Sequence, residues 1–338
     1  MAALIRQARQ LLDEGESVVM VTVAEAKGST PREVGTRMLF TADRQWQTIG
    51  GGHLEWKAAK LARELIASTA PLVSERRIEH FPLGPALAQC CGGYVTLVFE
   101  HLGTRDLPWL EELAAVLQRG QSAQRRVGFG EAMDKDVHLD IEVTHAHSGL
   151  SEHESELGTW FIDHIAPPKM QIMLFGAGHV GKALVQILGG IHCQVTWVDE
   201  RESEFPNELP HNVSTFITDF PEEAVELAKP ETYFLVMTHR HDLDLQLCMR
   251  ILDRNDFSYA GVIGSLTKKA KFEKRLQQRG FTEIQRQRLT CPIGIGGISR
   301  KEPMAIAVSI AAELLRLNEQ QPSLSTPQTL TATLGSSY

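Results

Sequence analysis

The sequence predicts a two-domain α/β protein, with a Rossmann-like doubly wound parallel sheet in its C-terminal half and an α+β domain before it. Two observations support this prediction. A chain of 338 residues is too long for one ordinary hydrophobic core. From residue 170 onward, short apolar runs alternate with helical patterns, which is typical of a parallel sheet covered by helices on both faces.

The composition of the chain changes at two places, which we interpret as domain boundaries. Residues 145–169 are rich in His, Ser, Glu and Pro and end in Pro167-Pro168, so they are predicted to be an interdomain linker. We therefore expect the N-terminal α+β domain over residues 1–144 and the Rossmann-like domain over 170–318. Residues 319–338 hold Ser, Thr and Pro with almost no charge and are expected to be disordered.

The periodicity of apolar residues places the individual elements. In the C-terminal half we expect strands at 171–175, 194–199, 213–218, 233–238, 259–264 and 288–292. Helices are expected between the strands, the first at 180–188, and the last helix is expected at 303–317. In the N-terminal half we expect helices in the first 14 residues and at 53–67 and 107–119. Strands are expected there at 17–26, 37–41, 46–49, 75–81, 94–100, 126–132 and 137–143.

Composition and charge exclude several classes of function. A net charge of −8 and a pI near 5.9 argue against nucleic acid or an anionic membrane as the main partner. No apolar stretch is long enough for a membrane span, and the first residues lack a signal-peptide core, so a cytoplasmic protein is expected. The five cysteines have no CxxC spacing and are expected to be thiols.

A GxGxxG motif begins the Rossmann-like domain at Gly176, Gly178, His179 and Gly181. It follows an apolar strand, opens a helix and is followed by Asp199 at the end of the next strand, so its context is that of a dinucleotide fingerprint. The helix N-terminus would receive a diphosphate and Asp199 a ribose diol, which favours NAD over NADP. The alternative is that the glycines serve packing alone.

A second glycine loop lies in the N-terminal half. Gly50, Gly51 and Gly52 come before a helix that carries His53 and Glu55 in its first turn. Three glycines in this setting predict a backbone nest for a phosphate or an oxyanion, with both side chains beside it. The alternative is a plain tight turn with a solvated histidine.

Two adjacent cysteines stand before two glycines, at Cys90, Cys91, Gly92 and Gly93. Adjacent cysteines do not readily chelate one tetrahedral metal, and a disulfide between them is strained. One thiolate could instead bind a soft metal or carry sulfur. Packing of small side chains in a turn explains the pair equally well.

Two polar clusters follow predicted strands of the Rossmann-like domain. His239, His241 and Asp244 come after the fourth of these strands, where they could ligate a metal, bond a polar ligand or cap the next helix. The basic segment 267–271 begins another helix, where bound phosphate or a solvated basic face would account for its charge.

These motifs occur in the order that the XdhC/CoxI family shows, and the chain closely resembles that family over nearly its whole length. The segments that carry the resemblance are GSTPREVGTRM (28–38), IGGGHLE (49–55), LGPALAQCCGG (83–93), FGAGHVG (175–181), VDER (198–201), THRHDLD (238–244), GVIGSLTKKAKF (261–272) and CPIG (291–294).

The resemblance implies a maturation factor for xanthine dehydrogenase that is not an enzyme in the turnover sense. Such proteins bind molybdenum cofactor, protect it while a cysteine desulfurase exchanges an oxo ligand for sulfur, and insert it into the apo-enzyme. Expected partners are the molybdenum-binding subunit of xanthine dehydrogenase, a cysteine desulfurase and a second copy of the chain. A dinucleotide in the Rossmann-like domain remains an additional expectation.

The resemblance also assigns candidate cofactor-binding residues. The two glycine loops and the cysteine–glycine segment belong to them; His239 and His241 are added as candidate cofactor-binding residues because they follow a strand at the ligand-binding edge of the sheet. Many members have cysteine directly after the first glycine loop, where this chain has His53, so Cys90 or Cys91 becomes the candidate molybdenum thiolate. We further expect Gly51 and Gly178 to face one cleft between the domains.

Two other classes of function remain open from the sequence. One is an NAD-dependent oxidoreductase, and the other is a nucleotide-binding regulatory module. Against the oxidoreductase, no tyrosine has a lysine four residues later, so the proton-transfer pair of short-chain dehydrogenases is absent. The sequence also has no GxxxxGK[ST] and no GxSxG motif.

Overall fold

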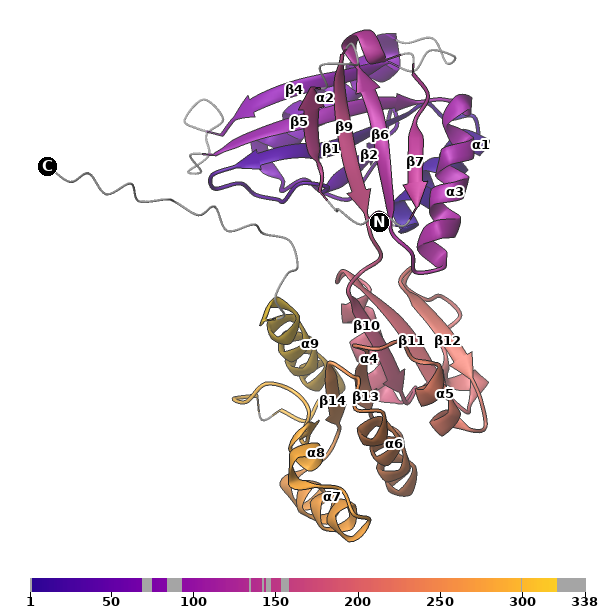
Figure 1. Cartoon of the computed structure of the whole chain (residues 1–338), viewed down its shortest axis with the longest axis vertical. Helices are drawn as coiled ribbons and strands as arrows, with labels where there is room; N and C mark the ends of the chain where they lie inside the picture. Colours follow the sequence, from indigo (N-terminus) through magenta and orange to yellow (C-terminus); the bar gives the residue numbers. More distant parts are fainter. Residues whose placement is uncertain are drawn as a thin grey trace, which may run out of the picture. The chain divides into compact units, whose positions relative to one another are not determined.

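The chain divides into two compact units, Met1–Pro167 and Pro168–Tyr338, and each is described by itself (Figure 1). A computed structural model describes residues 2–68, 75–83, 93–133, 135–141, 143, 147–152, 158–298 and 300–320. In this part of the chain no helix is both long and apolar enough to cross a membrane.

The first unit is built on an antiparallel sheet in the order β3-β2-β1-β5-β4. Its strands are β1 (Val18–Lys27), β2 (Arg37–Phe40), β3 (Gln45–Trp46), β4 (Arg76–Pro82) and β5 (Tyr94–Leu102). Both faces of β1 are buried, because Val19 and Val21 pack beneath helix α2 (Gly52–Ser68), whereas Val18 and Met20 face α1 (Ala2–Asp13) and α3 (Leu107–Gln118). The continuous apolar run of β1 is thus explained by cover on both sides.

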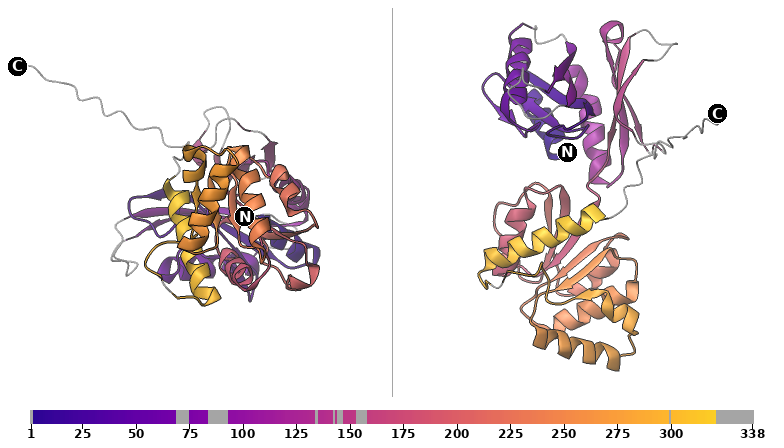
Figure 2. Two further views of the ribbon diagram at one scale, coloured as in Figure 1. Left: turned by 90° about the horizontal axis from the view of Figure 1, so that it is seen from below. Right: turned by 90° about the vertical axis from the view of Figure 1, so that its left-hand side faces the viewer.

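A second antiparallel sheet completes the first unit, in the order β7-β6-β9-β8 (Figure 2). It consists of β6 (Ala123–Phe129), β7 (His138–Ile141), β8 (Gly149–Glu152) and β9 (Thr159–Ile165). Strands β8 and β9 lie within the segment 145–169, which the sequence predicted to be a linker. The difference has a physical cause, since Trp160 and Phe161 are buried and β9 pairs with β6 along its whole length.

Four buried charged side chains join these two sheets. Arg125 of β6 forms a two-pronged ion pair with Glu100 of β5, at 3.0 and 2.8 Å, and donates to Asp163 of β9 at 3.1 Å. Asp163 also accepts a hydrogen bond from Arg37 of β2. Two positive and two negative charges therefore compensate each other where all four side chains are at most 1% exposed.

The second unit is a six-stranded parallel sheet in the order β12-β11-β10-β13-β14-β15. Its strands are β10 (Met170–Phe175), β11 (Cys193–Asp199), β12 (Val213–Ile217), β13 (Tyr233–Val236), β14 (Tyr259–Val262) and β15 (Leu289–Thr290). The helices are α4 (His179–Leu188), α5 (Pro221–Leu227), α6 (His241–Arg254), α7 (Leu266–Gln278), α8 (Glu283–Gln287) and α9 (Pro303–Gln320). This confirms the predicted doubly wound sheet.

The two faces of this sheet carry separate hydrophobic cores. Residues of α4 and α9 pack on one face around Trp197, and residues of α5, α6 and α7 pack on the other around Phe234 (Figure 2). The strand order reverses at β10, whose neighbours are β11 and β13. Open α/β sheets bind ligands at the carboxyl ends of the strands beside such a reversal.

The buried charge network makes a testable prediction for the first unit. Arg125→Met removes the guanidinium and leaves Glu100 buried without its main partner, so we expect a loss of about 3–5 kcal/mol in the free energy of unfolding. Arg9→Met is the matched control, because Arg9 lies on the surface 3.6 Å from Asp13 and its loss should cost less than about 1 kcal/mol. Urea unfolding followed by circular dichroism measures both, and equal midpoints for the two variants would contradict the role given to the network.

Candidate functional sites

The glycine loop of the first unit has a backbone that only glycine adopts readily. Gly50, Gly51 and Gly52 have φ angles of 118°, 76° and 64°. A side chain at Gly50 would also meet Pro31, since an added Cβ would lie 2.4 Å from the Pro31 Cβ, whereas nothing lies within 4 Å of one at Gly51. The loop is therefore strained for any other residue, and at Gly50 it is also closely packed.

Two of the three glycine N–H groups of this loop, those of Gly50 and Gly51, are bonded to side chains of the same unit. Glu55, in the first turn of α2, accepts the Gly51 N–H at 3.0 Å and the Thr48 hydroxyl at 2.6 Å through one carboxylate oxygen. The Gly50 N–H donates to the Thr48 hydroxyl at 3.0 Å. One N–H group predicted to bind a phosphate, that of Gly51, is thus bonded to the chain's own carboxylate, which the positive end of the α2 dipole also favours.

An exposed aromatic pair stands beside the loop. His53 is exposed and stacks on Trp56, with the ring centroids 5.3 Å apart and the planes 24° from parallel. Trp56 is 59% exposed. Trp56 was not among the residues predicted from the sequence, although its position three residues after His53 places both side chains on one face of the helix.

Three motifs of the first unit meet at the loop between β1 and β2. Gly50 contacts Pro31 of that loop, as described above. Gly93 packs against the backbone of the same loop, because an added Cβ there would lie 2.3 Å from the Ser29 carbonyl oxygen and 2.7 Å from that of Lys27. The Leu83 N–H donates to the Gly93 carbonyl at 2.8 Å, so these two residues are bonded to each other beside the same loop. Cys90, Cys91 and Gly92 lie outside the described residues.

The cysteines that the structure describes are buried thiols. Burial raises the pKa of Cys193 to about 12, and it also raises the pKa of Cys248 and of Cys291. Because a metal ligand must be a thiolate, these side chains are unsuited to that role. Cys90 and Cys91 stay the candidates.

In the Rossmann unit, packing accounts for two glycines of the fingerprint and leaves the third unexplained. An added Cβ at Gly176 would lie 2.3 Å from the Met237 carbonyl oxygen, and one at Gly181 would lie 2.2 Å from the carbonyl oxygen of Gly176. At Gly178, directly before α4, nothing lies within 4 Å. An alternative based on packing alone does not explain Gly178, whereas a ligand approaching the backbone does.

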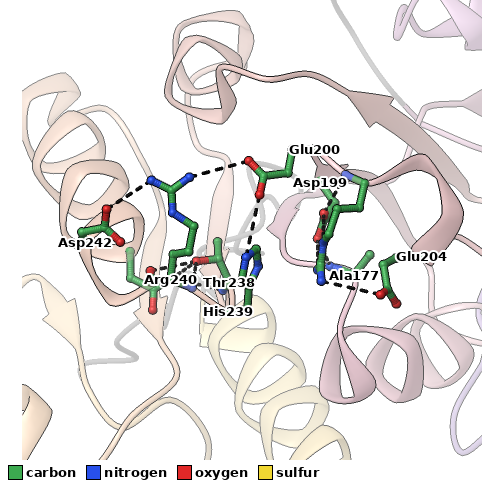
Figure 3. Close-up of polar contacts among 10 residues, drawn as sticks. Ala177, Asp199, Glu200, Glu204, Thr238, His239, Arg240 and Asp242 are labelled. Carbon is green, nitrogen blue, oxygen red and sulfur yellow. Dashed lines mark hydrogen bonds and ion pairs between the residues drawn. The ribbon is translucent and has the colours of Figure 1, made fainter.

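Asp199 has every acceptor position occupied (Figure 3). One carboxylate oxygen accepts the Ala177 N–H at 2.6 Å and an Arg201 Nη2 donor at 2.9 Å. The other accepts the Arg201 backbone N–H at 3.0 Å and its Nε–H at 2.9 Å. A carboxylate offers about four lone-pair positions, so no acceptor is left for a ribose diol in this arrangement.

These bonds also set the ionisation of Asp199. Its burial alone would raise the pKa of the carboxyl group, but the hydrogen bonds from Arg201 and from the Ala177 backbone outweigh burial and lower the pKa below its usual value. Asp199 is therefore a firmly ionised side chain that fastens the glycine loop to β11.

Two other carboxylates near Asp199 each lie between two basic side chains. Glu204 lies 2.6 Å from Lys182 Nζ and 3.6 Å from Arg201 Nη1. Glu200 lies 3.8 Å from both His239 Nε2 and Arg240 Nη1 (Figure 3). Because Glu200 follows β11 and His239 follows β13, this second group spans the carboxyl end of β10.

In the polar cluster after β13, the buried Asp244 carboxylate joins Thr238 to Lys268. Asp244 is 1% exposed and accepts the Thr238 hydroxyl at 2.7 Å and the Lys268 ammonium at 2.6 Å. Across the described part of the chain, no three His, Cys, Asp or Glu side chains are grouped so that they could hold a metal ion. The metal-binding alternative for His239, His241 and Asp244 is therefore wrong; His241 is an exposed residue that begins α6.

Lys268 is buried and hydrogen-bonded, so it is not part of a solvated basic face, which was one interpretation of the segment 267–271. Its ammonium also donates to the Ile263 carbonyl at 2.6 Å, and its side chain is 9% exposed. It fastens the start of α7 to the start of α6.

Comparison with known proteins agrees with this two-part architecture. A model of the XdhC Rossmann domain matches residues 172–314, and a model of the XdhC and CoxI family matches residues 11–78. The chain belongs to the XdhC and CoxI family.

Relatives of this XdhC-family chain match more than nine tenths of its length. It is 24% identical to a probable subunit of xanthine dehydrogenase from Bacillus subtilis (strain 168), over 92% of this chain and 96% of that protein. It is 23% identical to the molybdenum cofactor insertion chaperone PaoD of Escherichia coli (strain K12), over 96% of this chain and 91% of that protein. A crystal structure of a xanthine dehydrogenase from Bacillus halodurans has the same fold, with a TM-score of 0.73 and 22% identity over 96% of this chain and 98% of that one.

The first glycine loop predicts unequal effects of two similar substitutions. Gly51→Ala adds only the cost of a positive φ, about 1–2 kcal/mol of unfolding free energy. Gly50→Ala adds the overlap with Pro31 as well, so we expect a further loss of about 1–3 kcal/mol. Thermal unfolding compares the two variants, and an equal loss in both would contradict the packing described for Gly50.

The Asp199 carboxylate predicts a pH-dependent stability. Its folded pKa lies below the ordinary value of 3.8, so its contribution is complete above roughly pH 5 and is lost as the pH falls through the folded pKa. We therefore expect Asp199→Asn to melt below the wild type at pH 7, with the difference closing as the pH falls below 3.8. A melting-temperature difference that stays constant from neutral to acidic pH would contradict this assignment.

Proposed function

We propose that this chain is a molybdenum cofactor chaperone. It holds the cofactor while sulfur replaces an oxo ligand on molybdenum, and then inserts it into an apo-enzyme of the xanthine dehydrogenase class. The full-length similarity to a cofactor insertion chaperone and to a probable xanthine dehydrogenase subunit supports this proposal. Because one of these relatives is a cofactor insertion chaperone, the similarity also favours an accessory protein over an enzyme with turnover.

The meeting of three motifs at the β1–β2 loop is the observation that carries the proposal. The first glycine loop contacts Pro31, and the base of the cysteine segment contacts Ser29 through Gly93. Cys90 and Cys91 precede Gly93 by three and two residues in the sequence, and we infer that they serve this part of the unit. A soft thiolate near a polar surface is the kind of ligand that suits molybdenum.

Side chains of the first glycine loop suit the organic part of such a cofactor. A pterin ring has a flat aromatic face and an edge of N–H donors. Trp56 supplies an exposed aromatic face, and the second carboxylate oxygen of Glu55 has only a long contact, 3.5 Å from the Gln45 amide. We infer that Glu55 accepts from the donor edge, while His53 and Trp56 support the ring face.

The remaining partners follow from the family resemblance and stay predictions. They are the molybdenum-binding subunit of xanthine dehydrogenase, which would receive the cofactor, and a cysteine desulfurase, which would deliver the sulfur. Self-association and a shared cleft for Gly51 and Gly178 are also still predictions.

The direct test is the content of the purified protein. After expression in a molybdate-replete host, we expect pterin and molybdenum in equal amounts, measured by pterin fluorescence after release and by elemental analysis. The same protein from a host that cannot make the cofactor is the control, and it should take up cofactor released from a molybdoenzyme. The proposal would be wrong if the protein from the first host contained no cofactor and the protein from the second host took none up.

The thiolate assignment has its own test. Cys90→Ala and Cys91→Ala are made singly and together, and their melting temperatures are compared with that of the wild type. We expect the double variant to retain the fold and to lose most of its molybdenum, because a neutral methyl group cannot replace a thiolate ligand. Unchanged molybdenum content in the double variant would show that the ligand lies elsewhere.

A further inference from the structure

The proposed function does not account for the Rossmann unit. Its fingerprint has an open glycine, Gly178, directly before helix α4, yet the acid expected to bind ribose is fully bonded. The residues around that acid indicate which ligand the unit would accept.

Asp199 holds the Arg201 guanidinium in a fixed orientation. It accepts from Nε and Nη2, at 2.9 Å each, and this leaves Nη1 directed to Glu204 at the longer distance of 3.6 Å. Asp199 thus serves as a positioning residue for a cation, and Arg201 covers the oxygens that a ribose diol would need.

A carboxylate already occupies the space between two cations at this point. Glu204 lies between Lys182 Nζ, at 2.6 Å, and Arg201 Nη1. All three side chains are between 34% and 40% exposed, so a ligand can reach them from solvent. A phosphate monoester carries the same type of oxygens as a carboxylate and more charge, and Arg with Lys is a common pair for binding it.

We propose that the Rossmann unit binds a dinucleotide that is phosphorylated on the adenosine 2′-hydroxyl, the class of NADP(H), in preference to NAD(H). The 2′-phosphate takes the place of the Glu204 carboxylate between Lys182 and Arg201. The dinucleotide diphosphate lies over Gly178 at the start of α4. This reverses the preference for NAD that Asp199 suggested in the sequence, because Arg201 has closed that acid to a diol.

Isothermal titration of the full-length protein with NADPH and NADH tests the preference. We expect NADPH to bind about tenfold more tightly or better, the equivalent of one charge-assisted pair. The fragments 2′,5′-ADP and ADP, which differ in the placement of one phosphate, should show the same order. Equal affinity of NADH and NADPH, or no binding of either at about 1 mM, would overturn the proposal.

Two variants with opposite expected effects distinguish binding at this site from non-specific attraction of the ligand's charge to the protein surface. Arg201→Ala should weaken NADPH binding about tenfold and abolish the preference over NADH. Glu204→Gln removes the competing carboxylate and should strengthen NADPH binding severalfold, with NADH unchanged.

The matched control is Arg250→Ala, which removes an exposed arginine of α6 that lies 3.8 Å from Glu226. It should leave both affinities unchanged. Because Glu204→Gln keeps all contacts of Asp199, it tests the proposal even if Arg201→Ala disturbs the fold. An unchanged or weaker NADPH affinity in Glu204→Gln, or the same loss in Arg250→Ala as in Arg201→Ala, would contradict the site.

Discussion

In each unit a carboxylate of the chain accepts a backbone N–H from a glycine loop, Glu55 in the first unit and Asp199 in the second. These hydrogen bonds fix the loops to a helix or a strand, and they decide what the loops can still bind. A backbone nest is attractive to any anion, so a loop filled by its own carboxylate is no longer a general phosphate site. Its specificity must come from the side chains around the carboxylate.

Those side chains differ between the two units, and so do the ligands that we assign to them. Around Glu55 they include an exposed aromatic pair, Trp56 stacked on His53. Around Asp199 they are basic, with Arg201 and Lys182 on either side of Glu204. The first arrangement suits a flat heterocycle with N–H donors, and the second suits a phosphate.

The sequence predicts the architecture well where the pattern is long and periodic. Six apolar strands alternating with helices led to the doubly wound sheet, and their order in the structure is the one that such a sheet adopts. The polar composition of residues 145–169 predicts a linker, but these residues also contain the short apolar run of β9. In the structure Trp160 and Phe161 of this strand are buried. Burial of Arg125 between two sheets was equally invisible, because the compensating acids Glu100 and Asp163 are distant in the sequence.

The sequence predicts which residues belong to the candidate sites, but it does not predict their hydrogen-bond and packing partners. The glycine motifs and Asp199 stand out in the chain, yet only the fold brings Ala177 and Arg201 onto Asp199. The contact of Gly50 with Pro31 depends in the same way on tertiary packing. A sequence pattern that recurs every few residues predicts local structure. Whether a carboxylate such as Asp199 is already hydrogen-bonded depends on residues that only the fold brings together.

Binding of the cofactor by the first unit, at the β1–β2 loop, is the claim on which the proposed function depends. Hydrogen–deuterium exchange of the full-length protein, with and without molybdenum cofactor, tests it most directly. We predict that the cofactor slows exchange in residues 27–36 and 48–56, where the glycine loop and its neighbour meet. Unchanged exchange in both segments, with protection only around residues 176–182 of the Rossmann unit, would contradict this claim.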